Sequence, residues 1–194
     1  MFIHLKEVPS TQTLLKELAL SGAPHGTLVS AERQTQGYGR FQRPWSSRRG
    51  GLWFSLLLRK EFQGAQEAQS RMLESVTQSV EKVAGVRLKT KPSQTSKSSR
   101  FGTYQATTLR FLGTPNDLGV FQKGAWRKVC GILTEFENRN GRIDWIVLGV
   151  GINVNNPIPA SLKSQAVSLK QLGGQPVNLQ KIWESILDDW NLHG

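Results

Sequence analysis

The chain has 194 residues, of which 38% are hydrophobic, and a formal net charge of +11. This length and composition predict one globular domain with a complete hydrophobic core and exclude a disordered chain. No apolar run approaches the roughly 20 residues of a membrane span, no signal-peptide pattern opens the chain, and the single cysteine, Cys130, excludes an intramolecular disulfide framework. We expect a cytoplasmic protein with no membrane partner.

The positive charge allows two interpretations. A strongly basic domain is often a nucleic-acid-binding module, but it can also hold an anionic small ligand among solvated lysines. The basic residues here are spread over three stretches, at 33–59, 87–110 and 123–128, and no compact basic helix opens the chain. We therefore expect no nucleic-acid partner.

The first half of the chain predicts two helices and a strand–loop–strand unit. Residues 10–20 begin with capping residues and carry leucines at helical spacing, and residues 21–26 end that helix. Strands are expected at 27–31 and 52–58. Apolar residues at helical spacing predict a second helix over 65–84, with Gly85 as its end, and a strand begins at 86–88.

The second half predicts a loop, a hairpin and a closing helix. Residues 89–108 are polar and basic without periodicity, which is typical of a surface loop, and residues 114–117 form a turn signature. Strands at 128–136 and 145–154 flank a turn at 138–141, and two glycines in the second strand indicate a bulge or a close ligand. A helix over 179–190 follows. This order predicts an α+β domain with a mixed, largely antiparallel sheet covered by helices.

The strongest candidate site is the loop of residues 34–45, which combines two glycines, two arginines and Trp45. Glycine lets a backbone approach a ligand closely, and guanidinium groups bind carboxylate or phosphate through two hydrogen bonds. The loop predicts an anionic ligand with an aromatic or apolar part. No phosphate-binding loop, dinucleotide fingerprint, nucleophile elbow or zinc-ligand spacing occurs in the sequence.

Three further polar segments lie at the ends of expected elements, and each has a structural alternative. Ser10 could be only a helix cap, residues 116–117 only a turn, and Lys128 only a solvated lysine, while Trp45 could belong to the core. Paired arginines beside glycines serve poorly in an ordinary hairpin turn. Of these segments, only the loop of residues 34–45 therefore favours a ligand over a structural role.

Taken together and in order, these segments resemble the catalytic domain of biotin protein ligases. The resemblance covers residues 10–155 and rests on five motifs: Ser10-Thr11-Gln12, the loop with Gly37, Gly39, Arg40, Arg43 and Trp45, then Pro115-Asn116-Asp117, Lys128-Val129-Cys130-Gly131-Ile132-Leu133 and Gly149-Val150-Gly151-Ile152-Asn153. It implies the class II aminoacyl-tRNA-synthetase-like fold of biotin and lipoate ligases. It also implies formation of biotinyl-5′-AMP from biotin and ATP with Mg²⁺, and transfer of biotin to a lysine of a biotin carboxyl carrier protein or domain of a carboxylase.

The resemblance also implies roles for individual residues. Arg40 and Lys128 would be catalytic, because they would offset the repulsion between the biotin carboxylate and the α-phosphate. The biotin site would comprise Ser10, Thr11, Gln12, Gln34, Gly37, Tyr38, Gly39, Arg40, Lys128 and Gly131. The ATP site would comprise Arg40, Arg43, Trp45, Asn116, Asp117 and Asn153. No dedicated metal site is expected, since Mg²⁺ would arrive with ATP.

The chain departs from the family pattern at two places. Tyr38 replaces the arginine usually found between the loop glycines, and Gly113-Thr114 replaces Lys-Trp before Pro115. We expect an inserted flexible loop at about 89–113, with Lys89 supplying the missing phosphate contact. The expected domain content is one catalytic domain over 1–194, with neither an N-terminal DNA-binding domain nor a C-terminal SH3-like domain, as a monomer or homodimer.

Two other functions stay open beside biotin ligation. A lipoate–protein ligase shares the fold and the acyl-adenylate chemistry, although the arginine-rich loop ending in Trp45 favours biotin. A non-catalytic biotin- or adenylate-binding protein is suggested by Tyr38 and Gly113-Thr114.

Overall fold

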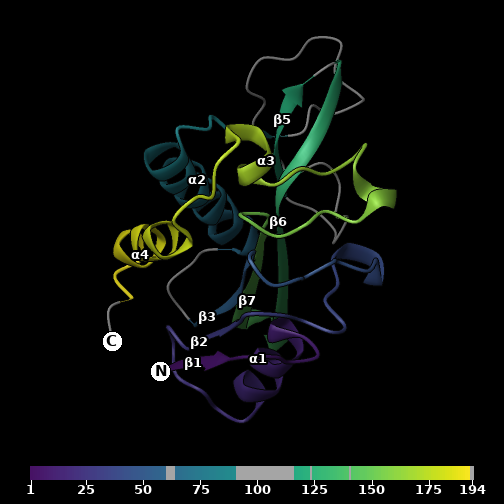
Figure 1. Cartoon of the computed structure of the whole chain (residues 1–194). Helices are drawn as coiled ribbons and strands as arrows, with labels where there is room; N and C mark the ends of the chain where they lie inside the picture. Colours follow the sequence, from purple (N-terminus) through teal and green to yellow (C-terminus); the bar gives the residue numbers. More distant parts are fainter. Residues whose placement is uncertain (60–63, 91–115, 123, 140, 193–194) are drawn as a thin grey trace, which may run out of the picture.

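A seven-stranded mixed sheet organises the chain, with strand order β1-β2-β3-β7-β6-β5-β4 (Figure 1). The computed structural model describes residues 1–59, 64–90, 116–122, 124–139 and 141–192. The strands are β1 (Phe2–Leu5), β2 (Leu28–Ala31), β3 (Leu52–Leu58), β4 (Lys89–Thr90), β5 (Asp117–Gln122), β6 (Ala125–Arg139) and β7 (Arg142–Ile152). Strand β1 pairs with β2 in parallel, and all the other pairs are antiparallel.

The helices cover the two faces of this sheet. They are α1 (Thr11–Leu20), α2 (Ala65–Ala84), α3 (Leu169–Gly173) and α4 (Leu179–Asp189), with 3₁₀ turns at Arg40–Gln42 and Ala160–Leu162. Helices α2 and α4 pack together on one face (Figure 1), whereas α1 packs on β2, β3 and β7 over the other. No helix in the described residues is long and apolar enough to cross a membrane.

Strand β3 shows why the sheet is buried on both faces. Its sequence is an apolar run interrupted only by Ser55, and every residue in it is buried. Leu56 belongs to the core beneath α2 and α4, while its neighbour Leu57 belongs to the smaller core beneath α1. A strand covered on both sides needs apolar residues at successive positions, because alternate side chains point to opposite faces.

The predicted helix ends are confirmed. Ser10 caps α1, since its hydroxyl accepts a hydrogen bond from the Thr13 amide at 3.3 Å. Helix α2 ends at Gly85, which adopts the left-handed conformation with φ 64° that glycine takes without a steric cost. The β6–β7 hairpin and the antiparallel pairing of β2 with β3 also match the expected order.

Several expectations are corrected. Residues 86–88 lie outside any strand, and the next strand begins at Lys89. Asp117 is the first residue of β5 and not part of a turn, because the Asn116 carbonyl accepts the Ile132 amide and draws the chain alongside β6. Strands β1 and β5 and the short helix α3 were not predicted. The loop expected at 89–113 begins as β4 at 89–90, and its remainder lies outside the described residues.

Candidate active site

Glycines on β6 and β7 leave one patch of the sheet without side chains. Gly131 on β6 is paired with Gly151 on β7, and the Trp45 ring covers both. A β-carbon on Gly151 would lie 2.6 Å from the Trp45 indole nitrogen, and one on Gly131 would lie 3.3 Å from the Trp45 ring. The register of β7 is regular here, so the glycines mark a close contact and not a bulge. The close partner is the protein's own tryptophan.

A connected set of hydroxyls and amides forms one end of the site. The Gln34 side-chain oxygen accepts a hydrogen bond from the Thr11 amide at 2.8 Å, and the Thr11 hydroxyl, with its single proton, can donate either to this oxygen at 3.0 Å or to Ser55. The Ser55 hydroxyl donates to the Gln12 side-chain oxygen at 3.0 Å. Gln12 in turn donates to the Val147 carbonyl. Helix α1, the loop and β3 therefore hold each other's polar groups in fixed directions.

A β-bulge directs Lys128 into the site. Leu118 pairs with Cys130 whereas the next residue, Gly119, pairs with Lys128, so Val129 is the extra residue on β6. Without a bulge Lys128 and Gly131 would point to opposite faces, because their separation is odd. The bulge re-aims Lys128 onto the face of Gly131.

The charge of Lys128 is balanced by Asp117 and lies beside an aromatic ring. The Lys128 ammonium is 2.5 Å from an Asp117 carboxylate oxygen and 4.7 Å from the centre of the Trp45 ring. The Lys128 side chain is 23% exposed, so part of it is accessible to a ligand. Two residues farther along β6, burial raises the pKa of the Cys130 thiol far above its ordinary value, so this thiol is not a nucleophile.

The loop of residues 37–45 forms a small hairpin over the patch. The Gly39 amide bonds the Arg43 carbonyl, and the Trp45 amide bonds the Gly37 carbonyl at 2.8 Å. Phe41 and Gln42 at its tip have φ of 59° and 56°, a conformation uncommon for residues with a β-carbon. Backbone strain of this kind concentrates at ligand-binding segments.

Tyr38 connects the loop to a cluster on the body of the protein. Its hydroxyl donates to Glu135 on β6 at 3.1 Å, and the Lys16 ammonium on α1 contacts the other Glu135 oxygen at 2.9 Å. Burial alone would lower the pKa of Lys16, but hydrogen bonds to Glu135 and Tyr38 outweigh it and raise that pKa above its ordinary value.

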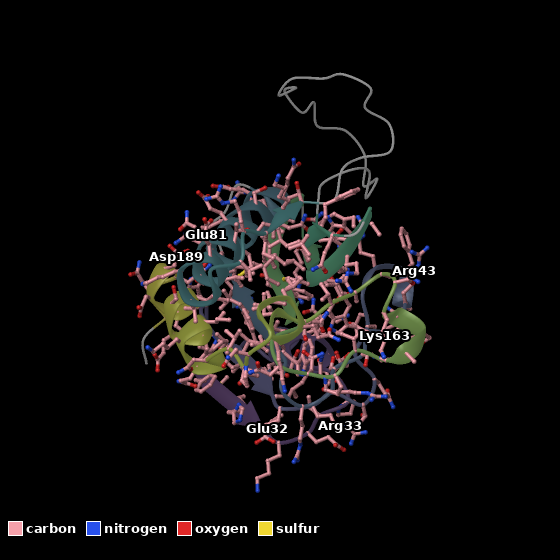
Figure 2. All side chains as sticks on the ribbon, turned by 45° about the horizontal axis from the view of Figure 1, so that its top comes forward. Glu32, Arg33, Arg43, Glu81, Lys163 and Asp189 are labelled. Carbon is pink, nitrogen blue, oxygen red and sulfur yellow. The ribbon has the colours of Figure 1, made fainter. Side chains whose placement is uncertain are left out.

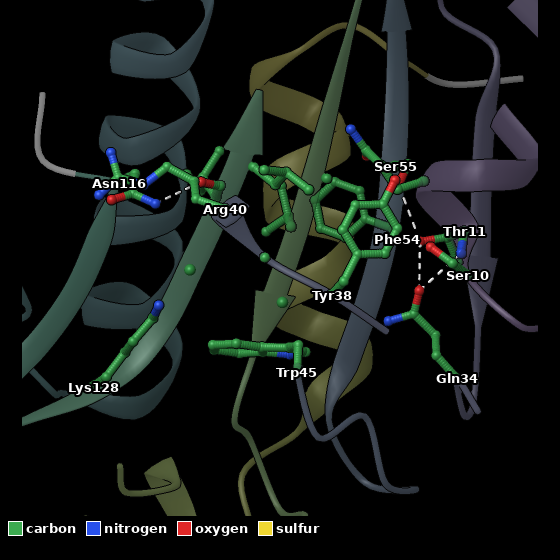
Figure 3. Close-up of a pocket in the computed structure, with 18 residues that line it drawn as sticks. Ser10, Thr11, Gln34, Tyr38, Arg40, Trp45, Phe54, Ser55, Asn116 and Lys128 are labelled. Atoms are coloured by element: carbon green, nitrogen blue, oxygen red, sulfur yellow. Dashed lines mark hydrogen bonds between the residues drawn. The ribbon is translucent and has the colours of Figure 1, made fainter. Parts of the chain in front are cut away.

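Two neighbouring pockets open beneath and beside the loop. The narrow one, of about 70 Å³, runs from the polar end at Ser10, Thr11, Gln34 and Ser55 to the end at Asn116 and Lys128, with Tyr38 and Trp45 between them (Figure 3). The wide one, of about 390 Å³, lies beyond Trp45. Both pockets share one wall, made of Gly39, Arg40, Trp45, Asn116 and Lys128.

The wide pocket is bounded on its far side by residues 158–166. This segment runs along β6, because the Lys128 amide bonds the Gln165 carbonyl and the Val167 amide bonds the Lys128 carbonyl. Arg43 lines the pocket and is exposed. Figure 2 shows Arg43 and Lys163 on one side of the molecule and the acidic Glu81 and Asp189 on the other. Positive charge from Arg43, and from Lys163 in the segment that bounds the pocket, therefore lies beside the wide pocket.

Most of the predicted site residues come together. Those lining the narrow pocket are Ser10, Thr11, Gln12, Gln34, Tyr38, Gly39, Arg40, Trp45, Asn116, Lys128 and Gly131. Those lining the wide pocket include Arg40, Arg43, Trp45, Asn116, Asp117, Lys128 and Asn153.

Gly37 and Lys89 line neither pocket. Gly37 is buried at the base of the hairpin, where a β-carbon would lie 2.7 Å from the Ser47 hydroxyl, so it serves the packing of the hairpin. Lys89 is exposed on β4 and is paired with Gly119. Its contact with phosphate stays a prediction.

Sequence reasoning missed several lining residues. Ser55 had a signal, since it is the one polar residue in the apolar run of β3. Trp126, Asn156 and the segment 158–166 had none, because only the path of the chain brings them to the wide pocket. No group of three or more His, Cys, Asp or Glu side chains in the described ranges could hold a metal ion.

The chain is similar to known proteins in both sequence and structure. A sequence model of the Biotin/lipoate A/B protein ligase family matches residues 5–153. The chain is 35% identical over 191 residues to the bifunctional ligase/repressor BirA of Bacillus subtilis (strain 168), covering 95% of this chain and 51% of BirA. It thus spans about half the length of the curated relatives it matches.

Solved structures share the fold. The biotin protein ligase from Aquifex aeolicus in complex with biotin and ATP superposes with a TM-score of 0.71 at 31% identity, covering 98% of this chain and 69% of that one. A putative lipoate protein ligase from T. acidophilum with bound lipoic acid has a TM-score of 0.63 at 12% identity, over 98% of this chain and 83% of that one. The second likeness concerns the fold alone.

Proposed function

Because the chain belongs to the biotin/lipoate A/B protein ligase family, we propose that it is an ATP-dependent biotin protein ligase. It forms biotinyl-5′-AMP and transfers biotin to a lysine of a biotin carboxyl carrier domain. The observation that carries this proposal is the shared wall of the two pockets, where Arg40 and Lys128 both face the place at which two ligands would meet.

The narrow pocket suits the biotin head group. A urea ring needs donors and acceptors at fixed positions, which the network of Thr11, Gln12, Gln34 and Ser55 supplies. Apolar Phe54, Ile132, Leu133 and Val150 line the same pocket and suit the sulfur ring and the alkyl chain. The carboxylate would then extend toward Lys128, at the opposite end in Figure 3.

The wide pocket suits ATP. Its volume, the Trp45 ring and the amides of Asn153 and Asn156 fit a nucleotide, with Arg43 at its open side. Mg²⁺ is usually held by one or two carboxylates together with substrate phosphates. Asp117 is the one carboxylate among the described lining residues, so it would share Mg²⁺ with the phosphates, where the ion neutralises phosphate charge.

Two anions must come together in the first reaction. A biotin carboxylate oxygen forms a bond to the α-phosphorus while the bond from that phosphorus to pyrophosphate breaks. Lys128 and Arg40 reduce the repulsion between the reacting anions, and their effect is large because the site lies against a buried sheet. Asp117 holds Lys128 beside the site before any ligand arrives.

The second reaction releases AMP. The amine of the carrier lysine forms a bond to the biotinyl carbonyl carbon, the bond from that carbon to the AMP oxygen breaks, and the amine loses a proton. Arg40 would retain the adenylate and exclude water until the carrier binds. Positive charge beside the wide pocket attracts an acidic carrier and raises its rate of association. The proposed place of action is the cytoplasm.

The test is transfer of labelled biotin to an apo carrier domain with ATP and Mg²⁺, run beside identical reactions with lipoate. Biotin on the carrier supports the ligase. Transfer of lipoate but not biotin would assign the lipoate ligase activity. Formation of the adenylate without transfer would indicate a protein that forms and binds the adenylate but is not a ligase. Absence of an adenylate with either acid would contradict the proposed catalytic activity.

A further inference from the structure

Besides Trp45, Tyr38 gives the hairpin loop a side-chain contact with the body of the protein. The hairpin of residues 37–45 has its backbone hydrogen bonds between Gly37 and Trp45 and between Gly39 and Arg43, so they are internal to it. Trp45 rests on the glycines of β6 and β7. Farther along β6 the Tyr38 hydroxyl reaches Glu135.

The position of Glu135 on β6 explains this contact. Gly131, Leu133 and Glu135 alternate along β6, so they share one face, and the first two line the narrow pocket. Glu135 therefore projects from the floor of the site toward the loop. Lys16 on α1 binds its other oxygen and lies 5.7 Å from the centre of the Tyr38 ring.

The Tyr38–Glu135–Lys16 cluster thus joins three separate elements at the edge of the narrow pocket. A hydrogen bond from a hydroxyl to a carboxylate is stronger than a hydrogen bond between two neutral groups. The raised pKa of Lys16 is consistent with a cation held by its neighbours. Tyr38 itself lines the narrow pocket, and Arg40 follows two residues later.

We propose that Tyr38 is a positioning residue, whose bond to Glu135 holds the loop over the narrow pocket and sets where Gly39 and Arg40 meet the biotinyl group. The inference rests on the proposed function for the identity of the ligand. Tyr38 stands where the family pattern has an arginine. The tyrosine contacts Glu135 through a hydrogen bond from its hydroxyl, whereas an arginine could contact it only as an ion pair. Fixing the loop before binding reduces the conformational entropy lost when the ligand arrives.

The test removes one oxygen atom with Tyr38→Phe. We expect amide hydrogen exchange of the peptide spanning residues 37–45 in the ligand-free protein to become about ten-fold faster, since one charge-assisted hydrogen bond is lost. We expect a similar increase in the rate of biotinyl-AMP release and in KM for biotin. Thr77→Val, which removes a hydroxyl bonded to the Leu73 carbonyl in α2, is the matched control and changes none of these.

A double-mutant cycle with Glu135→Ala assigns the effect to this contact. Tyr38→Phe should add nothing further once Glu135 is absent. Unchanged exchange in Tyr38→Phe would overturn the proposal, and so would faster exchange with unchanged adenylate release. If the wild-type protein forms no adenylate, the proposed function fails, while the exchange measurement still decides whether Tyr38 holds the loop.

Discussion

The indole nitrogen of Trp45 lies 2.6 Å from the position that a β-carbon on Gly151 would occupy. The loop can therefore rest on the sheet only because β7 carries no side chain at that position. Trp45 separates the two pockets, so this contact sets the dimensions of both.

Replacing this glycine should displace the tryptophan. Gly151→Ala is expected to cost about 1–3 kcal/mol of stability through overpacking and to weaken binding of both biotin and ATP, as measured by urea unfolding and calorimetric titration. Gly173→Ala is the control, because a β-carbon there meets nothing within 4 Å. Equal affinities in wild type and Gly151→Ala would contradict the role of the contact.

Removing the charge of Lys128 should slow the first reaction. Lys128→Met is expected to lower the rate of biotinyl-AMP formation about 100-fold or more, by analogy with loss of one transition-state donor. The measurement is pyrophosphate release in a single turnover. Lys163→Met removes a cation outside both pockets and should leave the rate within two-fold of wild type, about the scatter expected of a surface charge. A similar decrease in both variants would indicate a general charge effect.

Besides its part in the first reaction, Arg40 should hold the adenylate after it has formed. We expect Arg40→Ala to release biotinyl-AMP about ten-fold faster or more, because a charge-assisted contact to the phosphate is lost. Release is followed by trapping the free adenylate in the absence of a carrier. Arg139→Ala, a matched change at the exposed end of β6, should have no effect. Unchanged release from Arg40→Ala would contradict this role.

Loss of the small Ser55 hydroxyl should lower both the stability of the protein and its affinity for biotin. Its hydroxyl bonds both Thr11 and Gln12, so Ser55→Ala leaves buried partners unsatisfied, which costs about 1–3 kcal/mol. The expected result is lower stability and weaker biotin binding. Ser75→Ala is the control, because the buried Ser75 hydroxyl bonds no described residue and its removal should be neutral or stabilising. Equal losses from both variants would argue against a network.

The stability of the protein should fall at alkaline pH through Cys130. Burial raises the pKa of this thiol above its ordinary value of 9.0. Above about pH 9 the unfolded chain loses the thiol proton while the folded chain keeps it, so the free energy of unfolding decreases with pH by up to about 1.4 kcal/mol per pH unit. Cys130→Ala should show a shallower decrease between pH 9 and 10. Parallel slopes in urea unfolding would contradict this assignment.

Local signals were sufficient for most of the helices and for the long strands. Ser10 and Gly85 mark helix ends because their side chain and backbone freedom satisfy groups that the helix itself leaves open. The apolar run of β3 and the turn between β6 and β7 are likewise local patterns. Strand β1 was missed, because its four residues are a strand only through pairing with β2.

The sequence by itself determined the α+β class, the loop with its arginines and tryptophan, and nearly all the residues of the polar end. Only the tertiary structure decided how they act together. The extra residue Val129 that turns Lys128 toward Asp117, the glycines that receive Trp45, and the Tyr38 contact with Glu135 all depend on pairing between distant segments. No local pattern encodes them, because strand register and loop placement are set by the packing of the whole sheet.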